Sequence, residues 1–600
     1  MSRTSYRLAF PEPHTHLVEV EARFAAAADH GDALDLHMAA WTPGSYLVRD
    51  YARHVQDLVA TDESGRRLAV EKQDKARWRV SLAGGRDLIV RYRVYAWELT
   101  VRTSHVDESH AFVNGAPTYL WLKEREAEAA TVRVEAPAGW RVVAGLLPGG
   151  TPGTFIAKNL DELIDSPLHA APGLVHELTA AGKPTQVAIW GRPEFAASGG
   201  PAGIETLLAD VRTIIDHYAA LFGGENGPMV PYDRYAFLLM LAPGAYGGLE
   251  HRASTALLSS PFAFSSKKKY EELLELVSHE YFHLWNVKRI RPRALGPFDY
   301  TREAYTRALW IMEGITSYYD RYTLRRTGLQ PAKRYLEKLA SEWGKLVATP
   351  GRAKQSLEES SFDAWIKLYR PDENSVNSTV SYYLKGGIVT LCLDLEIRRR
   401  SGGKKSMDDV LRHLWREHGM KDVGFDETTF RGEVERAVDL DLSEFWARSV
   451  VGREDPDLAG ALAAAGLELK ASWEKPAGEN GAASAPAWLG TTLKTEGGRA
   501  VVVSTLTGSP GEAAGLYAGD EIVACEGWKV ASENALGERL ASRKPGDAVR
   551  LALFRRDELR EIKVTLGEAP RDKWEIVARK DASAAERALH EAWLGEKLPE

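Results

Sequence analysis

Two histidines and a glutamate lie close together in the segment 278–283, which reads Ser-His-Glu-Tyr-Phe-His. On a helix, residues four apart share a face, so His279 and His283 can bind one metal ion together. Imidazole suits zinc, and a zinc ion held by three protein ligands keeps a fourth position for water. Such a water ionises near neutral pH, and Glu280 is placed to take its proton. The segment therefore predicts a metal centre that activates water, provided that the chain supplies a third ligand.

Two downstream glutamates are candidates for that ligand. Glu313 is the acidic residue within the apolar part of the segment 308–320, which has helical character. A buried carboxylate is costly unless it is paired or bound to a metal, which favours Glu313. Glu303 stands among Arg302, Tyr305 and Arg307 near the start of the same helix, where a solvated acid is ordinary. Glu303 stays as the weaker alternative.

The elements around these residues follow from hydrophobic periodicity. Apolar residues at helical spacing predict a helix over 204–221, which the pair Gly223–Gly224 should end. A buried strand is expected over 235–241, followed by a Gly-rich loop over 244–252 that contains Gly247, Gly248 and Glu250. The next long helix should run from Lys269 to about Asn286 and carry both histidines. A loop of this kind brings backbone close to a neighbour and here ends in a carboxylate.

The first third of the chain alternates apolar and polar residues with period two. The segments 16–22, 76–82 and 88–94 each predict a strand with one buried face. Gly and Pro punctuate these strands, which indicates a sandwich or an open β-domain. The loop 41–51 combines aromatic residues, a Pro-Gly turn and charges, and it is either a contact between domains or a wall of a substrate cleft. The turn over 112–116 has the same two interpretations.

Composition bounds the class of protein. With 600 residues, 44% hydrophobic and 27% charged, the chain should form several globular domains. The net charge of -7 gives no argument for nucleic acid or for an anionic membrane surface. Cys392 and Cys525 stand in apolar runs and are expected to be buried free thiols rather than a disulfide. No signal peptide and no apolar run long enough to cross a membrane is evident, so a soluble cytoplasmic protein is the default expectation.

Several short motifs resemble those of the gluzincin group of zinc aminopeptidases. The segment 309–314, Leu-Trp-Ile-Met-Glu-Gly, looks like the segment that carries their glutamate ligand, which corresponds to Glu313. Gly247-Gly248-Leu249-Glu250-His251 resembles the loop whose glutamate binds the free α-amino group of the substrate. Segment 381–386 resembles their Tyr-x-Lys-Gly segment, and in that register Tyr383, not Tyr382, matches the tyrosine that hydrogen-bonds the tetrahedral intermediate. The spacing from His283 to Glu313 is longer than is usual in the group, whose register would place the ligand at Arg302.

Together with the loop over 43–46 and a C-terminal PDZ module, these motifs are most similar to the glycyl aminopeptidase family. The resemblance covers residues 5 to about 570. It implies an aminopeptidase with one zinc ion per chain, on His279, His283 and Glu313, and Glu280 as the base. Tyr383 would stabilise the oxyanion and Glu250, with Gly247 and Gly248, would bind the substrate's amino end, with Gly and Ala preferred. The alternatives are a zinc endopeptidase that captures chain ends with its PDZ module, and an adaptor protein with a vestigial site.

The expected architecture is a multidomain α+β protein. It comprises a β-rich domain over 1–175, a thermolysin-like zinc catalytic domain over 176–330, a helical domain over 331–470, a PDZ domain over 487–570 and a helical tail over 571–600. Segment 474–486 has the composition of a linker. Segment 509–523 resembles a long PDZ signature, so a peptide C-terminus is an expected partner, although the module could instead only pack against the rest of the chain. Ser583 and Glu586 should cap the tail helix. Along the helix after Tyr383, Asp394, Glu396 and Arg398 are expected to form a solvated face.

Overall fold

The computed structural model describes residues 3–25, 31–82, 87–173, 175–193, 203–474 and 484–599. It forms two compact units. The first comprises Met1–Thr306, Tyr319–Gln330 and Asp408–Glu433, and the second comprises Arg307–Tyr318, Pro331–Met407 and Val434–Glu600. Both units thus include segments that are distant in the sequence.

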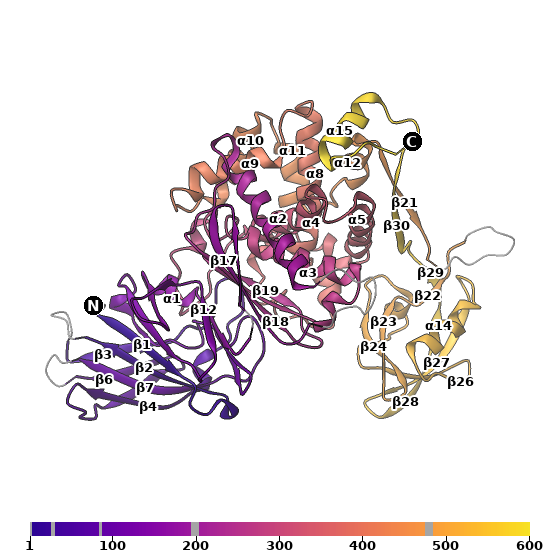
Figure 1. Cartoon of the computed structure of the whole chain (residues 1–600). Coiled ribbons are helices and arrows are strands. Elements are labelled where there is room, and N and C mark those ends of the chain that lie inside the picture. The colour runs from indigo at the N-terminus through magenta and orange to yellow at the C-terminus, as the bar shows by residue number, and fades with distance from the viewer. Residues whose placement is uncertain are drawn as a thin grey trace. The chain divides into compact units, whose positions relative to one another are not determined.

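The first unit begins with three β-sheets. Figure 1 shows β1, β2, β7 and β4 of the largest sheet, a seven-stranded one, at the N-terminal end of the chain. Its spatial order is β13 (Leu147–Pro148), β14 (Thr154–Ala157), β11 (Ala130–Glu135), β1 (Thr4–Ala9), β2 (Leu17–Phe24), β7 (Leu88–Tyr95) and β4 (Val55–Asp62). The two four-stranded sheets are β10 (Trp121–Leu122), β3 (Ala33–His37), β6 (Arg77–Ser81), β5 (Val70–Asp74), and β12 (Arg141–Ala144), β15 (Leu168–Ala171), β9 (His110–Val113), β8 (His105–Asp107).

The alternation that predicted these strands also sets their buried faces. In β6, Trp78 and Val80 are buried while Arg79 and Ser81 are exposed, because successive side chains of a strand point to opposite faces. The strand-rich prediction for the first third is confirmed.

A mixed α/β part follows in the same unit. Its five-stranded sheet has the order β16 (Val175–Ala180), β17 (Lys183–Trp190), β18 (Tyr235–Leu241), β20 (Ser254–Ser259) and β19 (Gly247–Glu250). β17, β18 and β20 are parallel, whereas β16 and β19 are antiparallel edge strands. The helices α2 (Ile204–Gly223) and α3 (Lys267–Phe282) belong to this part. The predicted strand over 235–241 is β18, and the predicted Gly-rich loop contains the short strand β19.

The segment 307–464 is mainly helical and is divided between the two units, since Tyr319–Gln330 and Asp408–Glu433 belong to the first. A π-helical turn, η7 (Trp310–Gly314), runs without a break into α4 (Ile315–Arg326). Among the helices that follow are α5 (Ala332–Val347), α6 (Leu357–Phe362), α7 (Ser375–Ser378), α8 (Tyr382–Arg400), α9 (Met407–Leu414), α10 (Phe430–Val438), α11 (Ser443–Trp446) and α12 (Leu458–Ala464).

The expectation of a solvated face on α8 is wrong for two of its three residues. Asp394 is 0% exposed and Arg398 is 7% exposed. They form an ion pair of 2.9 Å, and Asp394 also accepts a hydrogen bond from the Tyr318 hydroxyl at 2.7 Å. The i, i+4 pair of opposite charges, typical of a solvated helix, is here a buried pair because further helices pack on this side of α8.

The chain ends in a β-domain and a helix. The sheet has the order β23 (Thr491–Glu496), β24 (Arg499–Thr505), β25 (Glu521–Cys525), β27 (Ala548–Arg555), β28 (Glu558–Thr565), with β26 (Trp528–Lys529) on β25. This part also contains the helices α13 (Pro510–Ala513) and α14 (Glu533–Ala541). Two further pairs of strands are β21 (Leu467–Ser472) with β30 (Lys573–Ala578) and β22 (Ala487–Trp488) with β29 (Gly567–Glu568). The tail helix α15 (Ala584–Leu594) has the predicted capping box of Ser583 and Glu586. Most of the predicted linker, residues 475–483, lies outside the described residues.

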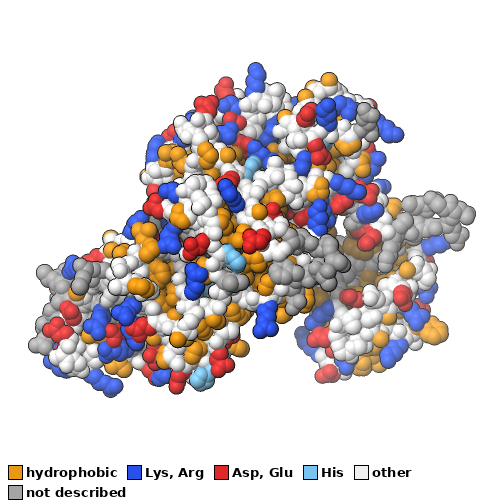
Figure 2. Space-filling model, in the orientation of Figure 1, with side chains coloured by type: hydrophobic (Ala, Val, Ile, Leu, Met, Phe, Trp, Pro, Cys, Tyr) orange, Lys and Arg blue, Asp and Glu red, His pale blue; other side chains and the backbone are white. Residues whose placement is uncertain are grey.

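Three further expectations can be compared with the described residues. Cys392 and Cys525 are buried free thiols, as predicted. None of the described helices combines the length and the apolar character that a membrane span needs. On the face shown in Figure 2, acidic and basic side chains are interspersed, which agrees with the small net charge.

Candidate metal centre and substrate site

Helix α3 carries the histidine pair. Ser266 caps its start, with the hydroxyl accepting a hydrogen bond from the backbone N–H of Lys269. The helix ends at Phe282, earlier than predicted, but His283 keeps helical dihedral angles (φ −58°, ψ −18°), so both imidazoles stay on one face. Their Nε2 atoms are 3.1 Å apart. Two nitrogens bound to one tetrahedral zinc ion would be roughly 3.3 Å apart, so the pair has the separation that a shared ion requires.

The other ring nitrogen of each histidine is held by an acceptor. Nδ1 of His279 lies 3.0 Å from Oδ2 of Asp320, and Nδ1 of His283 lies 2.8 Å from the carbonyl oxygen of Asn286. When both Nδ1 atoms carry the proton, both Nε2 atoms present a lone pair to the same point. This is the arrangement that orients metal-binding histidines, and it fits zinc without any change of ring orientation. The motifs do not single out Asp320, although it follows Glu313 by seven residues, which is a same-face spacing.

Glu313 lies on the π-helical turn η7 and is 3% exposed. Such turns are rare and are frequent at functional sites. The Glu313 carboxylate is a potential metal ligand. Two imidazoles and one carboxylate are a donor set of catalytic zinc sites. Glu303 lies in the irregular segment before η7 and is partly exposed.

Glu280 and Glu250 are buried beside the histidine pair. One carboxylate oxygen of each lies within 4.8 Å of the other and of a His283 ring nitrogen. Gly248 on β19 passes directly over Glu280, since a Cβ at this position would lie 2.0 Å from Oε1 of Glu280. Gly248 and Glu250 point to the same face of the strand. The absence of a side chain at Gly248 therefore makes room for the Glu280 carboxylate next to that of Glu250.

The loop over 41–51 reaches the same carboxylate. Gly44 has a φ of +84°, and a Cβ there would lie 2.5 Å from Oε2 of Glu250. Glycine is suited to both the left-handed backbone and the close approach. The structure thus places this loop against the Glu250 side chain. Of the two interpretations of the loop, contact with Glu250 agrees with the wall of a substrate site.

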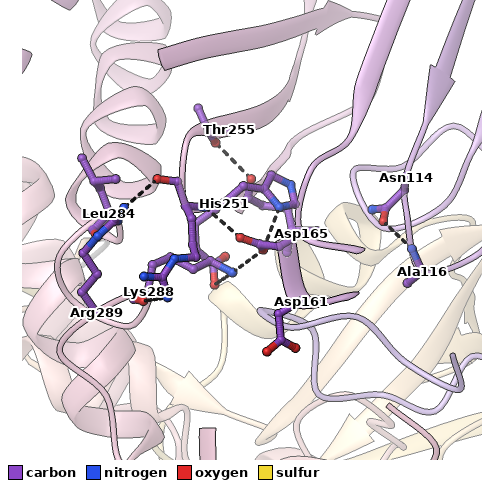
Figure 3. Close-up of polar contacts among 12 residues, drawn as sticks. Asn114, Ala116, Asp161, Asp165, His251, Thr255, Leu284, Lys288 and Arg289 are labelled. Atoms are coloured by element: carbon purple, nitrogen blue, oxygen red, sulfur yellow. Dashed lines mark hydrogen bonds and ion pairs between the residues drawn. The ribbon is translucent and has the colours of Figure 1, made fainter. Parts of the chain in front are cut away.

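A buried charge network lies behind Glu250, and the sequence pattern did not reveal it. Figure 3 shows Asp165 between His251 and Lys288. Nζ of Lys288 is 2.8 Å from Oδ1 of Asp165 and 3.7 Å from Oε1 of Glu250. Burial opposes the ionised form of Asp165, but the charge of Lys288 and the hydrogen bond from His251 outweigh it and hold the pKa of Asp165 well below its usual range. Burial likewise opposes the charge on Lys288, yet Asp165 and Glu250 raise its pKa.

Arg289, also labelled in Figure 3, binds backbone carbonyl groups near the C-terminal end of α3. Its guanidinium donates to the carbonyl oxygens of Leu284 at 2.9 Å and Pro231 at 2.8 Å. Carbonyl groups at a helix end lack partners within the helix, and a buried cation can satisfy them. Arg289 therefore helps to hold the segment that carries His283 and Lys288.

In the second unit, Tyr383 lies in the first turn of α8. Ser381 caps this helix, as its hydroxyl accepts from the N–H of Leu384. Gly386 and Gly314 bring α8 and η7 together, because a Cβ on Gly314 would lie 2.7 Å from Cα of Gly386. Burial, and then the charge of Glu313, raise the pKa of Tyr383 well above its usual range. The phenol is therefore a protonated hydrogen-bond donor at neutral pH.

Comparison with known families divides the chain in the same order as its motifs. The Peptidase M61 N-terminal domain matches residues 5–172, the M61 glycyl aminopeptidase model matches residues 272–389, and the PDZ model matches residues 487–566. The segment matched by the peptidase model contains His279, Glu280, His283, Glu313 and Tyr383.

Known structures and sequences give three further likenesses. A crystal structure of an aminopeptidase N family protein from Idiomarina loihiensis is 31% identical, with a TM-score of 0.89, over 98% of this chain and 100% of that chain. An M1 zinc metallopeptidase from Deinococcus radiodurans is 16% identical, with a TM-score of 0.47, over 76% of this chain and 94% of that chain. A probable periplasmic serine endoprotease of the DegP-like type from Rhizobium meliloti is 33% identical over 97 residues, which are 14% of this chain and 19% of that protein.

The matches at the family level agree with the motifs and with the histidine pair on α3. One relative above 30% identity extends over nearly the whole chain. The chain therefore belongs to the M61 glycyl aminopeptidase family, and it is a metalloaminopeptidase with a C-terminal PDZ domain.

Proposed function

We propose that this chain is a zinc aminopeptidase that releases single N-terminal residues, with Gly and Ala preferred. The observation that carries the proposal is the position of the Glu250 carboxylate beside Glu280 and His283. A carboxylate at this point can bind the free ammonium group of a peptide next to the reacting groups. The preference for small residues is supported by the description of the family as glycyl aminopeptidases.

His279, His283 and Glu313 would hold one zinc ion. When bound, zinc polarises the scissile carbonyl group and acidifies water. The fit rests on the 3.1 Å between the two Nε2 atoms and on the acceptors that face both Nδ1 atoms.

The remaining steps belong to side chains of the chain itself. Glu280 accepts the proton of the attacking water and returns a proton to the leaving amine. Tyr383 donates a hydrogen bond to the developing oxyanion, in agreement with a raised pKa that keeps its phenol protonated. These roles are consistent with the matched family segment.

Glu250 retains a negative charge for the substrate although a cation lies nearby. Lys288 is closer to Asp165, at 2.8 Å, than to Glu250, at 3.7 Å. Lys288 and Asp165 together are neutral, so the charge of Glu250 is left to balance an incoming ammonium group. A free amine bound one residue away from the metal restricts cleavage to a single residue from the N-terminus.

The PDZ domain is proposed to bind the C-terminal end of a peptide as an added strand. Leu489 and Gly490 occupy the place of a carboxylate-binding loop, and Gly490 has a φ of +76°. Glycine suits this left-handed backbone, because it has no Cβ to strain it.

The experiment compares arylamides of Gly, Ala and Leu that have a free amine with their N-acetylated forms, on protein of measured zinc content. We expect cleavage of the free Gly and Ala substrates, slower cleavage of the Leu substrate, and none of the acetylated set. Equal cleavage of the acetylated substrates would establish the endopeptidase alternative. A protein that holds zinc and cleaves neither set would support the vestigial adaptor.

A further inference from the structure

We propose that the β8–β9 hairpin of the N-terminal domain binds a divalent transition-metal ion through His105, Asp107 and His110. Each of these residues offers a ligand atom, and the three atoms lie within 4.8 Å of one another. The hairpin lies in the sheet β12–β15–β9–β8, far in sequence from the helix α3 that carries the catalytic histidines. The proposed reaction does not use it. The donor set, two imidazoles and a carboxylate, suits zinc and the metals next to it in the first transition row.

The two imidazoles face each other through the atoms that would bind the metal. Nδ1 of His105 lies 2.8 Å from Nε2 of His110. Two neighbouring ligand atoms, each about 2.0–2.1 Å from the ion, are roughly 2.9 Å apart in octahedral coordination and roughly 3.3 Å apart in tetrahedral coordination. A small opening of the pair would therefore admit the ion in place of the hydrogen bond between the rings.

A third histidine orients His110. Nδ1 of His110 lies 3.2 Å from Nε2 of His169 on β15. When His110 donates its Nδ1 proton to His169, its Nε2 lone pair points to His105. Metal-binding histidines use their second nitrogen in this manner, which sets the tautomer before the metal arrives.

Burial keeps the rings in the neutral form that metals need. His105, His110 and His169 are all buried. Burial lowers the pKa of His110, with further contributions from His169 and His105, and burial lowers the pKa of His169 to about 4. An ion that binds Nε2 of His110 would therefore not have to displace a proton from that ring. The proton between the two rings is then on Nδ1 of His105, and it can move to Nε2 of the same ring when a metal binds Nδ1.

Asp107 is fixed by the turn of the hairpin. Its Oδ1 accepts hydrogen bonds from the N–H of Ser109 at 2.7 Å, the hydroxyl of Ser109 at 2.6 Å and the N–H of His110 at 3.1 Å. All three bonds use the same oxygen, so the carboxylate is held in place while Oδ2 is the oxygen available to an ion. Asp107 is only partly buried, which supplies a route from solvent.

Aromatic side chains support the pair of rings. The Trp190 ring stacks on His110 with centroids 3.7 Å apart and an angle of 7°, and its Nε1 donates to the Ser109 hydroxyl at 3.1 Å. Trp97 stacks on His105 with centroids 5.2 Å apart. These contacts limit ring rotation, so the ligand positions are set by the fold.

The test counts metal on the full-length chain. The protein is stripped with a chelator, dialysed against buffered Zn2+, and analysed for zinc per chain beside the variants Asp107→Asn, His105→Gln and His283→Ala. We expect about two zinc ions for the unmodified chain and about one for each variant, because the hairpin and the catalytic histidines bind independently. Adding His105→Gln to His283→Ala should remove the remaining ion.

Asp107→Asn is the mild variant, since its amide oxygen can still accept the bonds of the turn. It should keep its melting temperature without metal and its peptidase activity while losing the second ion. Co2+ in place of Zn2+ should give visible absorption in His283→Ala that disappears with His105→Gln. Unchanged zinc content in both Asp107→Asn and His105→Gln would overturn the proposal. If His283→Ala alone lost zinc, the proposed hairpin site would be wrong but the proposed catalytic zinc site would still stand.

Discussion

The Oδ2 atom of Asp320 lies 3.0 Å from Nδ1 of His279, and both side chains are largely buried. The two residues come from different helices, α4 and α3, and their contact fixes which nitrogen of His279 presents its lone pair. Oδ1 of Asp320 is held in turn by the backbone N–H of Arg321 at 2.6 Å. The carboxylate therefore has a fixed position and acts on the ring as an orienting charge.

Replacement of Asp320 by Ala should weaken zinc binding about 10- to 100-fold, as is typical for the partner of a metal-binding histidine. Asp320→Asn should have a smaller effect, because its amide oxygen still accepts from Nδ1 but carries no charge. Competition with a chelator of known affinity measures the loss. Asp210→Asn, which affects the hydrogen bond from Tyr270 on the same helix α3, is the matched control and should bind zinc normally. Equal affinity of Asp320→Ala and the control would contradict an orienting role.

Glu280→Gln should keep its zinc and lose about 10²- to 10⁴-fold in kcat, the range of a general base. The amide fills the space under Gly248 but cannot accept a proton. Zinc content and the rate on Gly-arylamide check this together. Retained turnover in a variant with full zinc would remove Glu280 as the base.

Local patterns predict the elements that carry this site. The helix expected over 204–221 is α2, which ends at Gly223, and the next glycine has a φ of +54°. The strand predicted over 235–241 begins and ends at these residues in the structure. In these segments a single periodicity agrees with the turn residues on either side, so neighbours in the chain decide the outcome.

Contacts between distant segments could not be predicted in this way. Asp165 pairs with Lys288, and Asp320 with His279, across long stretches of chain. Lys288 precedes a run of basic residues and has the pattern of a solvated cation, and only the surrounding fold buries it. The π-helical turn at Glu313 has no propensity signal of its own, since its extra residue depends on packing.

The third ligand can be identified by paired variants. Glu313→Gln should lower zinc affinity by several orders of magnitude, because one of three protein ligands loses its charge. Glu303→Gln should bind zinc as the unmodified chain does, since Glu303 is partly exposed in an irregular segment. Chelator competition on both variants decides between them. A larger loss in Glu303→Gln would reverse the assignment.

Tyr383→Phe should lower kcat on Gly-arylamide about 10²- to 10³-fold, as for loss of an oxyanion donor, and leave KM nearly unchanged. Because the pKa of Tyr383 is raised well above 10.0, its neutral form persists through the alkaline range. The phenol should therefore contribute no alkaline limb to the pH profile of kcat, and the profile of the variant should have the same shape as that of the native enzyme. A limb that vanishes in Tyr383→Phe would contradict the raised pKa.

Lys288→Met should destabilise the chain by about 3–5 kcal/mol at pH 7, because it leaves buried carboxylates without their cation. The lowered pKa of Asp165 means that its contribution is present above its ordinary value of 3.8 and is lost as the pH falls through the depressed folded value. The raised pKa of Lys288 means that its contribution is present below 10.5 and is lost as the pH rises through the folded value. The free energy of unfolding of the native chain, measured with urea, should be constant between about pH 4 and pH 10. In acid, its difference from the free energy of the variant should become smaller. The double variant Lys288→Met with Asp165→Asn removes both charges and should recover most of the loss; if it is no more stable than Lys288→Met alone, the charge pair is not the cause.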